Sequence, residues 1–131
     1  MGRWTGSCHC GAVRFRIEGE IEELTRCGCS LCRRKGAQMA TVHEDALVIE
    51  AGEENLSLYR WNTGVARHYF CRTCGIYPFH KKRSMPDHYG VNVGCLEDFE
   101  PPAGVPFRWS EGTDMTVRPG GRADWSGPVD E

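Results

Sequence analysis

The 131-residue sequence predicts a mainly β fold built from antiparallel sheets. Apolar and polar residues alternate within short segments, which is the pattern of half-buried strands. Turn-forming residues separate these segments at intervals of roughly 8–15 residues. No segment shows the apolar period of a long amphipathic helix. A chain of this length can bury one core, so we expect one main domain.

The first three expected strands lie in the N-terminal half of the chain. Segment 12–18, AVRFRIE, places Val13 and Ile17 on one face and charged residues on the other. Segment 46–62, ALVIEAGEENLSLYRWN, is typical of a strand, a turn at Gly52 and a second strand.

The remaining expected strands surround a Cys-x-x-Cys turn. Segment 65–71, VARHYFC, predicts a strand that delivers this turn, and segment 75–80, GIYPFH, leads out of it. Segment 88–96, HYGVNVGCL, predicts a further strand with Val91 and Val93 on the same face.

The composition changes near residue 100, where EPPAGVP reads as a Pro/Gly connector. We therefore expect a zinc-binding β domain over residues 1–100. Residues 101–131 are expected to form a Pro/Gly-rich C-terminal extension that packs on this domain or trails from it. Trp109 and Trp125 are its candidate docking points.

Charge and hydropathy exclude several classes of function. The formal net charge is −2, which gives no general attraction for nucleic acid or for an anionic membrane. No apolar run reaches the roughly 20 residues that span a bilayer, and the N-terminal segment lacks the apolar stretch of a secretory signal. We expect a cytoplasmic protein, whose eight cysteines are metal ligands rather than disulfides.

Two cysteine pairs predict a closed four-thiolate zinc site. In a strand, residues i and i+2 point to the same face, so the sulfurs of a Cys-x-Cys pair can lean together over one tetrahedral ion. A disulfide across such a pair would be strained. Gly11 and Gly75 follow the two pairs and permit a left-handed turn. The expected ligands are Cys8, Cys10, Cys71 and Cys74.

The triplet Cys27, Cys29 and Cys32 leaves three further ligands. A structural zinc takes four protein ligands, whereas a catalytic zinc takes three and keeps a position for water or substrate. Three thiolates also form a soft site that suits an incoming thiol. Spacing alone leaves two other arrangements open. One is a second structural zinc completed by Cys95 or a histidine, and the other is a partition in which part of the triplet joins the first pair.

Four stretches of the chain occur in a recognisable order: GSCHCGAVRFRIE, CGCSLCRRKG, YRWNTGVARHYFCRTCGIYPF and YGVNVGCLED. They resemble the family that joins glutathione-dependent formaldehyde-activating enzyme with centromere protein V, and their detail is closer to the latter branch. The resemblance runs from about Gly6 to Phe99, and seven cysteines match in number, order and spacing. It implies an all-β, zinc-binding fold of the Mss4-like, or β-tent, type.

The resemblance also implies two zinc ions per chain and divides the ligands between them. Cys8, Cys10, Cys71 and Cys74 would hold a structural zinc. Cys27, Cys29 and Cys32 would hold a catalytic zinc. The family activity is carbon–sulfur bond formation and cleavage, in which glutathione and formaldehyde give S-hydroxymethylglutathione. We therefore expect a carbon–sulfur lyase whose partners are a small-molecule thiol and an aldehyde.

Basic residues and one histidine are candidate substrate-binding groups. Arg33 and Arg34, followed by Lys35, could clamp the carboxylates of a thiol tripeptide, and the alternative is a solvated basic turn. The segment HKKR at 80–83 is a second basic candidate. His68 could shuttle a proton or orient a ligand near a zinc ion, and the alternative is a packed, hydrogen-bonded histidine.

Two other functions stay open. The first is a non-catalytic zinc-binding interaction module of the centromere protein V type, which the slightly acidic charge disfavours for polymer binding. The second is a redox enzyme that uses Cys95 as an exposed, low-pKa thiol. We expect Cys95 to be a buried small apolar residue instead. The sequence leaves the oligomeric state open.

Overall fold

The computed structural model of the protein describes residues 2–60 and 65–110. Residues 61–64, which include the end of the strand segment expected over 46–62, lie outside the described residues, as do Trp125 and the rest of segment 111–131. No described helix is long and apolar enough to cross a bilayer.

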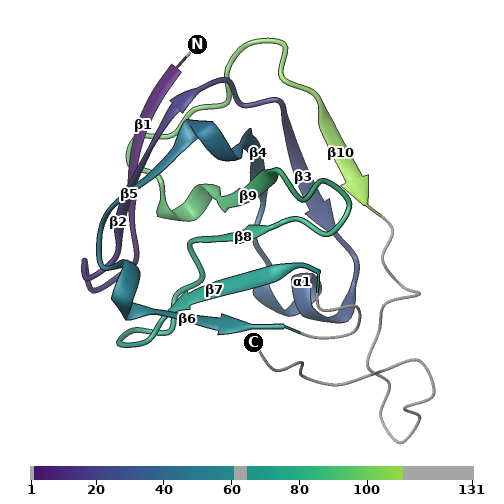
Figure 1. Ribbon diagram of the computed structural model, residues 1–131. Helices are drawn as coiled ribbons and strands as arrows, with labels where there is room; N and C mark the ends of the chain where they lie inside the picture. The colour runs from purple at the N-terminus through teal and green to yellow at the C-terminus, as the bar shows by residue number, and fades with distance from the viewer. Residues whose placement is uncertain (1, 61–64, 111–131) are drawn as a thin grey trace, which may run out of the picture.

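Two β-sheets form the framework (Figure 1). The three-stranded sheet contains, in spatial order, β1 (Gly2–Ser7), β2 (Arg14–Gly19) and β5 (Leu47–Ala51). The seven-stranded sheet contains β10 (Phe107–Ser110), β3 (Glu23–Cys27), β4 (Met39–His43), β9 (His88–Asn92), β8 (Phe79–Lys81), β7 (Arg67–Cys71) and β6 (Leu56–Tyr59). Among the described strands only β10 and β3 pair in parallel, so the predicted mainly β, antiparallel architecture is confirmed.

Short helical turns join the strands. The helix α1 (Ser30–Lys35) follows β3, and 3₁₀ turns occur at Glu44–Ala46, Glu53–Asn55 and Val93–Cys95. The last of these shortens the strand predicted over 88–96, because the Asn92 side chain accepts the Gly94 N–H and starts a turn. Val93 is therefore not in the strand that carries Val91.

Several elements were not predicted from the sequence. The helix α1 has six residues, which is too short to show a helical apolar period. The strands β1 and β10 are rich in Gly or exposed residues, and they gain their structure by pairing with β2 and β3. Residues 107–110 thus belong to the seven-stranded sheet, while the domain boundary near residue 100 stays a prediction.

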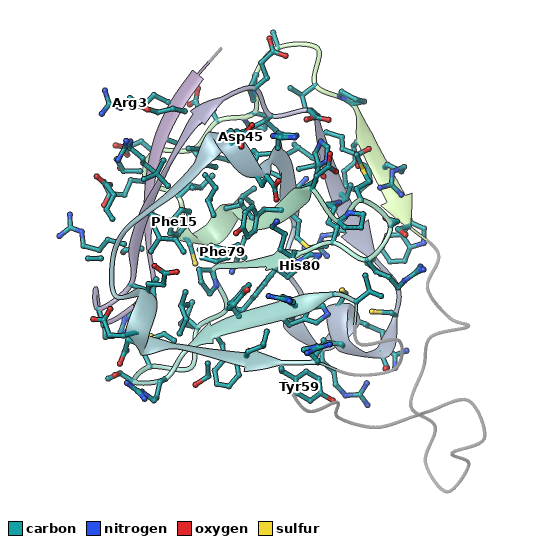
Figure 2. The ribbon with its side chains drawn as sticks, in the orientation of Figure 1. Arg3, Phe15, Asp45, Tyr59, Phe79 and His80 are labelled. Carbon is teal, nitrogen blue, oxygen red and sulfur yellow. The ribbon has the colours of Figure 1, made fainter. Side chains whose placement is uncertain are left out.

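The inner face of the seven-stranded sheet is apolar. Strand register places four buried residues side by side across four strands: Leu24, Ala40, Val91 and Phe79. This row packs against β2 of the other sheet, where Phe15 meets Phe79 edge to face at a ring separation of 5.3 Å. Figure 2 shows these two rings between the sheets. Burial of this apolar layer holds the sheets together.

The outer face of the same sheet is polar. One register row crosses five strands from β3 to β7, and its members are Glu23, Thr41, Gly90, His80 and His68. Because side chains alternate along each strand, Thr25 and Cys27 share this face with Glu23. The polar face therefore runs directly into the cysteine triplet.

A histidine at the outer end of β9 is held between two carboxylates. Its Nδ1 lies 2.7 Å from Asp87 Oδ1, and its Nε2 lies 2.9 Å from Glu22 Oε2. Burial alone would lower the pKa of His88, but these two hydrogen bonds outweigh it and raise the pKa above 6.5. The charged imidazolium thus ties the segment before β3 to β9.

The substitution Phe79→Ala should remove the centre of the apolar layer. We expect it to lower the free energy of unfolding by about 3–5 kcal/mol, because Phe79 is fully buried and contacts rings of both sheets. Denaturant unfolding of the metal-loaded protein measures this. Phe70→Ala is the matched control, since Phe70 is 37% exposed and its loss should cost about 0.5 kcal/mol. Equal losses would contradict the assigned core.

Stability should also depend on the protonation of His88. A raised pKa in the folded state contributes stability that is fully present below about pH 6.5 and is lost as the pH rises through the folded-state pKa. The difference in unfolding free energy between wild type and His88→Gln should therefore shrink between pH 6 and pH 8. A difference that is constant over this range would show that His88 is not charged in the folded protein.

Candidate functional site

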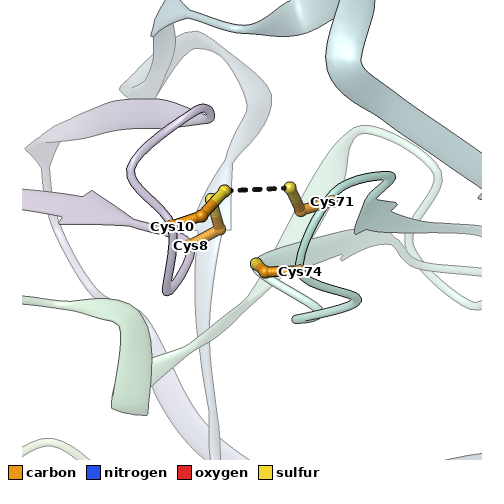
Figure 3. A group of neighbouring side chains, drawn as sticks. All are labelled: Cys8, Cys10, Cys71 and Cys74. Atoms are coloured by element: carbon orange, nitrogen blue, oxygen red, sulfur yellow. Dashed lines mark hydrogen bonds between the residues drawn. The ribbon is translucent and has the colours of Figure 1, made fainter.

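Four cysteine sulfurs converge where the two sheets meet (Figure 3). The turn after β1 supplies one pair, and the turn after β7 supplies the other. The Sγ atoms all lie within 4.8 Å of one another, with 3.6 Å between Cys8 and Cys10 and 3.7 Å between Cys10 and Cys71. Sulfurs bound tetrahedrally to zinc at about 2.3 Å are separated by roughly 3.8 Å. The group Cys8, Cys10, Cys71 and Cys74 could therefore hold one metal ion of this kind.

The backbone around this four-cysteine group is arranged by two similar turns. Cys8 and Cys10 lie in the turn after β1 rather than on a strand, so the predicted same-face geometry of a strand is not what brings them together. Gly11 and Gly75 adopt positive φ values of 82° and 78°, and their N–H groups donate back to Cys8 O and Cys71 O. Each turn thereby folds its two sulfurs toward one side.

Within this group, sulfur atoms accept hydrogen bonds, and the pKa of Cys71 is lowered while that of Cys10 is raised to about 11. The Val13 N–H donates to Cys8 Sγ over 3.4 Å, and Asn55 Nδ2 donates to Cys71 Sγ over 3.3 Å. Burial raises the pKa of Cys71, but the N–H groups of Cys74 and Thr73 outweigh it and bring the pKa to about 6. A metal would therefore meet a partly prepared ligand set.

The cysteine triplet forms a second, separate group. Cys27 ends β3, Cys29 caps the N-terminus of α1, and Cys32 lies within α1. Their Sγ atoms lie within 4.8 Å of one another. Cys29 Sγ accepts the Cys32 N–H at 3.3 Å, and Cys27 Sγ accepts the Cys29 N–H at 3.4 Å, so the strand-to-helix turn orients the sulfurs. Over residues 2–60 and 65–110, no fourth Cys, His, Asp or Glu joins this group.

The three thiols of the triplet share protons unequally. Hydrogen bonds from the Cys29 and Cys32 thiols hold the pKa of Cys27 far below its ordinary range. The same contacts raise the pKa of Cys29 and of Cys32. Without a metal, negative charge is therefore concentrated on Cys27, whereas a bound metal would take all three sulfurs as thiolates.

A cavity of about 110 Å³ opens beside the triplet. The three cysteines form one wall, and the remaining walls carry basic, hydroxyl and imidazole groups from the outer face of the seven-stranded sheet and from the segment after β8. Those used below are Thr25, His68, His80, Lys82, Arg83 and Arg108. A space of this size holds the reacting end of a substrate rather than a whole tripeptide.

Two stacked histidines form one side of this cavity. The rings of His68 and His80 lie 5.1 Å apart at 21°. Lys35 Nζ lies 2.8 Å from His68 Nδ1 and must be the donor, so the remaining proton of a neutral His68 is on Nε2. The Tyr77 hydroxyl donates to Gly90 O, so His80 Nδ1 donates to Tyr77 and its Nε2 is an acceptor. The pair thus offers one donor and one acceptor.

Burial keeps both histidines neutral. It lowers the pKa of His68 to about 3, with a further contribution from the nearby Lys35 ammonium. The pKa of His80 is also well below its ordinary value, mainly because the ring is buried. Burial lowers the pKa of Lys35 to about 8, although the triplet thiolates oppose this shift.

Because Gly90 has no side chain, the His80 ring can pack on the backbone of β9. A Cβ atom at this position would lie 2.5 Å from His80 Cε1, which is closer than carbon atoms can approach. The ring therefore lies directly over the backbone of β9, and the Tyr77 hydroxyl bonds both His80 Nδ1 and the Gly90 carbonyl.

The other side of the cavity carries basic side chains, and the carboxylate of Glu23 holds one of them, Arg108, in place. Glu23 accepts from Arg108 through both oxygens, at 3.1 and 2.9 Å. The Thr41 hydroxyl donates to the same carboxylate at 3.4 Å. Hydrogen bonds from Arg108 lower the pKa of Glu23, so the carboxylate stays ionised.

The structure separates the predicted substrate-binding residues. His68 lines the cavity, whereas Arg33 and Arg34 are exposed and do not line it. Arg34 donates to the Ser30 carbonyl over 2.9 Å instead. Lys35, the next residue, points inward to His68. A role for Arg33 and Arg34 in binding substrate stays a prediction.

The other cavity residues were predicted only weakly from the sequence or were not predicted. Lys82 and Arg83 belong to the second basic candidate, the HKKR segment. Thr25 and Arg108 were missed, although Thr25 lies two residues before Cys27 on an alternating strand, which could have placed it on the same face. Arg108 had no local signal, because only the pairing of β10 with β3 brings it to the cavity.

Cys95 belongs to the apolar core and to neither cysteine group. Burial raises its pKa to about 11, and its Sγ lies 3.6 Å from the Tyr77 carbonyl oxygen. This environment is opposite to that of a reactive thiol, as expected for a buried small apolar residue.

Comparison with known proteins shows the family of this chain. The sequence profile of the family described as "Glutathione-dependent formaldehyde-activating enzyme" matches residues 3–109, which is most of the chain. The chain belongs to the glutathione-dependent formaldehyde-activating enzyme family. The predicted family membership is therefore confirmed.

Two relatives of this family member illustrate the match. A Halomonas elongata protein, provisionally named as a glutathione-dependent formaldehyde-activating enzyme, is 36% identical over 78 residues, or 53% of this chain. The aligned part spans 50% of that relative's own length. A crystal structure of a Rhodobacter sphaeroides protein superimposes with a TM-score of 0.70 at 47% identity, covering 79% of this chain and 99% of the other.

The substitution Gly90→Ala should disturb the cavity wall of this family member. The added methyl would collide with His80, so we expect about 1–3 kcal/mol of lost stability and shifted imidazole NMR signals for His80 and His68. Gly94→Ala is the control, because its nearest contact would be Asn92 Oδ1 at 3.2 Å, away from the histidines. Unchanged imidazole signals in Gly90→Ala would contradict the placement of His80.

Proposed function

We propose that the protein is a zinc-dependent carbon–sulfur lyase that forms and cleaves adducts of a thiol with formaldehyde or another small aldehyde. The observation that carries this proposal is the asymmetry between the two cysteine groups. Four sulfurs surround one position, whereas three sulfurs border a cavity that has room for a ligand. The first arrangement suits a structural zinc held by Cys8, Cys10, Cys71 and Cys74. The second suits a catalytic zinc held by Cys27, Cys29 and Cys32.

The reaction adds the S–H group of the thiol across the C=O bond of the aldehyde. The thiol sulfur bonds to the aldehyde carbon, the carbonyl π bond breaks, and the thiol proton ends on the aldehyde oxygen. A zinc ion on three thiolates would supply Lewis acidity and a position at which a thiol loses its proton at neutral pH. The reverse sequence releases thiol and aldehyde.

The chain's own residues would position the reacting oxygen and carry its proton. His68, with Nε2–H as donor, is suited to donate a hydrogen bond to the aldehyde oxygen. His80, with Nε2 as acceptor, is suited to hold the hydroxyl of the adduct. The small cavity would hold both reactants side by side, which makes their addition effectively unimolecular.

The substrate class rests on the family and on a relative's name. The family description refers to glutathione and formaldehyde, and the Halomonas relative carries the same name. A non-catalytic interaction module would need neither the neutral histidine pair nor a polar cavity beside an incomplete ligand set. These features support the enzyme, within an Mss4-like β fold, over the interaction module.

The substitution Cys32→Ser tests the proposal. Wild type should contain two zinc ions per chain and should accelerate the exchange of formaldehyde with a thiol such as glutathione, as followed by NMR. Cys32→Ser should keep about one zinc ion, remain folded and lose the acceleration.

Cys95→Ala is the matched control, because it removes a cysteine that belongs to neither group. It should keep two zinc ions and full exchange activity. Equal exchange rates in wild type and Cys32→Ser would overturn the catalytic role of the triplet. Two zinc ions without acceleration for any thiol in a panel would favour the interaction module.

A further inference from the structure

Lys82 is a buried residue whose ammonium has one long ion pair. The side chain is 8% exposed and lines the cavity beside the triplet. Its nearest counter-ion is Glu23, at 3.9 Å, and the Glu23 oxygens already accept from Arg108 and Thr41. Across residues 2–60 and 65–110, the Lys82 ammonium donates no side-chain hydrogen bond. The ammonium therefore keeps donor capacity for a ligand in this cavity.

A second donor on the same cavity also lacks a partner. Thr25 is 2% exposed, and its Oγ1 makes no hydrogen bond within the described part of the chain. Thr25 lies on the same outer face of the sheet as Cys27. It precedes Cys27 by two residues on β3, which corresponds to about 6.7 Å. The hydroxyl of Thr25, which has no hydrogen bond, and the weakly paired ammonium of Lys82 thus line the same small space as the triplet sulfurs.

These two groups are costly unless a ligand satisfies them. A buried ammonium or hydroxyl without a hydrogen-bond partner destabilises the folded protein. Burial also lowers the pKa of Lys82, although Glu23 and the triplet thiolates oppose this shift. Arg83 and Arg108 line the same cavity, whereas the nearby negative charges are the Glu23 carboxylate and the triplet thiolates. The excess of positive charge and of donors selects an anionic acceptor.

We infer that Lys82 and Thr25 bind a carboxylate of the thiol substrate and so determine which thiols the enzyme accepts. This inference rests on the proposed function, because it places the carboxylate on the molecule whose sulfur meets the triplet. A planar carboxylate accepts several hydrogen bonds and can use the Lys82 ammonium and the Thr25 hydroxyl together. A neutral thiol of the same size would leave the ammonium unpaired, so it should bind less tightly.

Calorimetric titration of the zinc-loaded protein tests this inference with two thiols of matched size. The probes are 3-mercaptopropionate and 3-mercapto-1-propanol. Wild type should bind the carboxylate about tenfold more tightly, which is the effect of one charge-assisted hydrogen-bonded contact. Lys82→Met should reduce this preference to nearly one, and Thr25→Val should reduce it severalfold.

Lys81→Met is the matched control, because it removes the same charge from the neighbouring residue. Lys81 pairs with Glu44 instead of lining the cavity, so its loss should leave the tenfold preference intact. A wild-type protein without preference, or an undiminished preference in Lys82→Met, would overturn the inference. An equal loss in Lys81→Met would assign the effect to overall charge and would also overturn it.

Stability provides a second, independent measurement. Because the Lys82 ammonium is buried without a close partner, Lys82→Met should unfold at an equal or higher denaturant concentration than wild type. A marked loss of stability would mean that the ammonium serves the fold and would contradict the inference. The proposed function and this inference can be contradicted separately. A preference for the carboxylate thiol without formaldehyde exchange would contradict the lyase activity alone. Formaldehyde exchange without this preference would contradict the carboxylate site alone.

Discussion

The four-cysteine group joins the two sheets at one edge of the apolar layer that lies between them. Cys8 and Cys10 follow the first strand of the three-stranded sheet, while Cys71 and Cys74 follow a strand of the seven-stranded sheet. Their convergence sets the distance between the sheets at one edge, and the packing of Phe15 on Phe79 sets it in the centre. With the inner face of the large sheet occupied in this way, only its outer face is available for polar groups.

Alternation along the strands then divides the chemistry of the large sheet. Leu24 faces the core, and its neighbours Glu23 and Thr25 face outward, so one strand supplies both the packing and the cavity wall. The same division holds at β8, where Phe79 is part of the core and His80 lines the cavity. Substitutions that repack the core therefore act one residue away from groups of the site.

The sequence predicted the features that depend on local spacing. Both cysteine pairs, the triplet and the strands at β2, β5, β6 and β7 follow from short patterns. Features that depend on register between distant strands were not predicted. Arg108 and His80 reach one cavity because β10 pairs with β3 and β8 pairs with β9, which no local pattern encodes. A left-handed turn at Gly11 was expected, but Cys8 and Cys10 were assigned the geometry of a strand, since spacing alone does not distinguish a turn from a strand end.

The parallel strand β10 makes the cavity sensitive to the length of the segment before it. Arg108 and Ser110 line the cavity, whereas Phe107 and Trp109 alternate with them and are 55% and 56% exposed. Insertion or deletion of one residue in the connector that displaced the pairing by one step would turn both aromatic rings inward and Arg108 outward. A two-residue change would preserve the facing pattern. Length variation in this connector among homologues should therefore favour even steps.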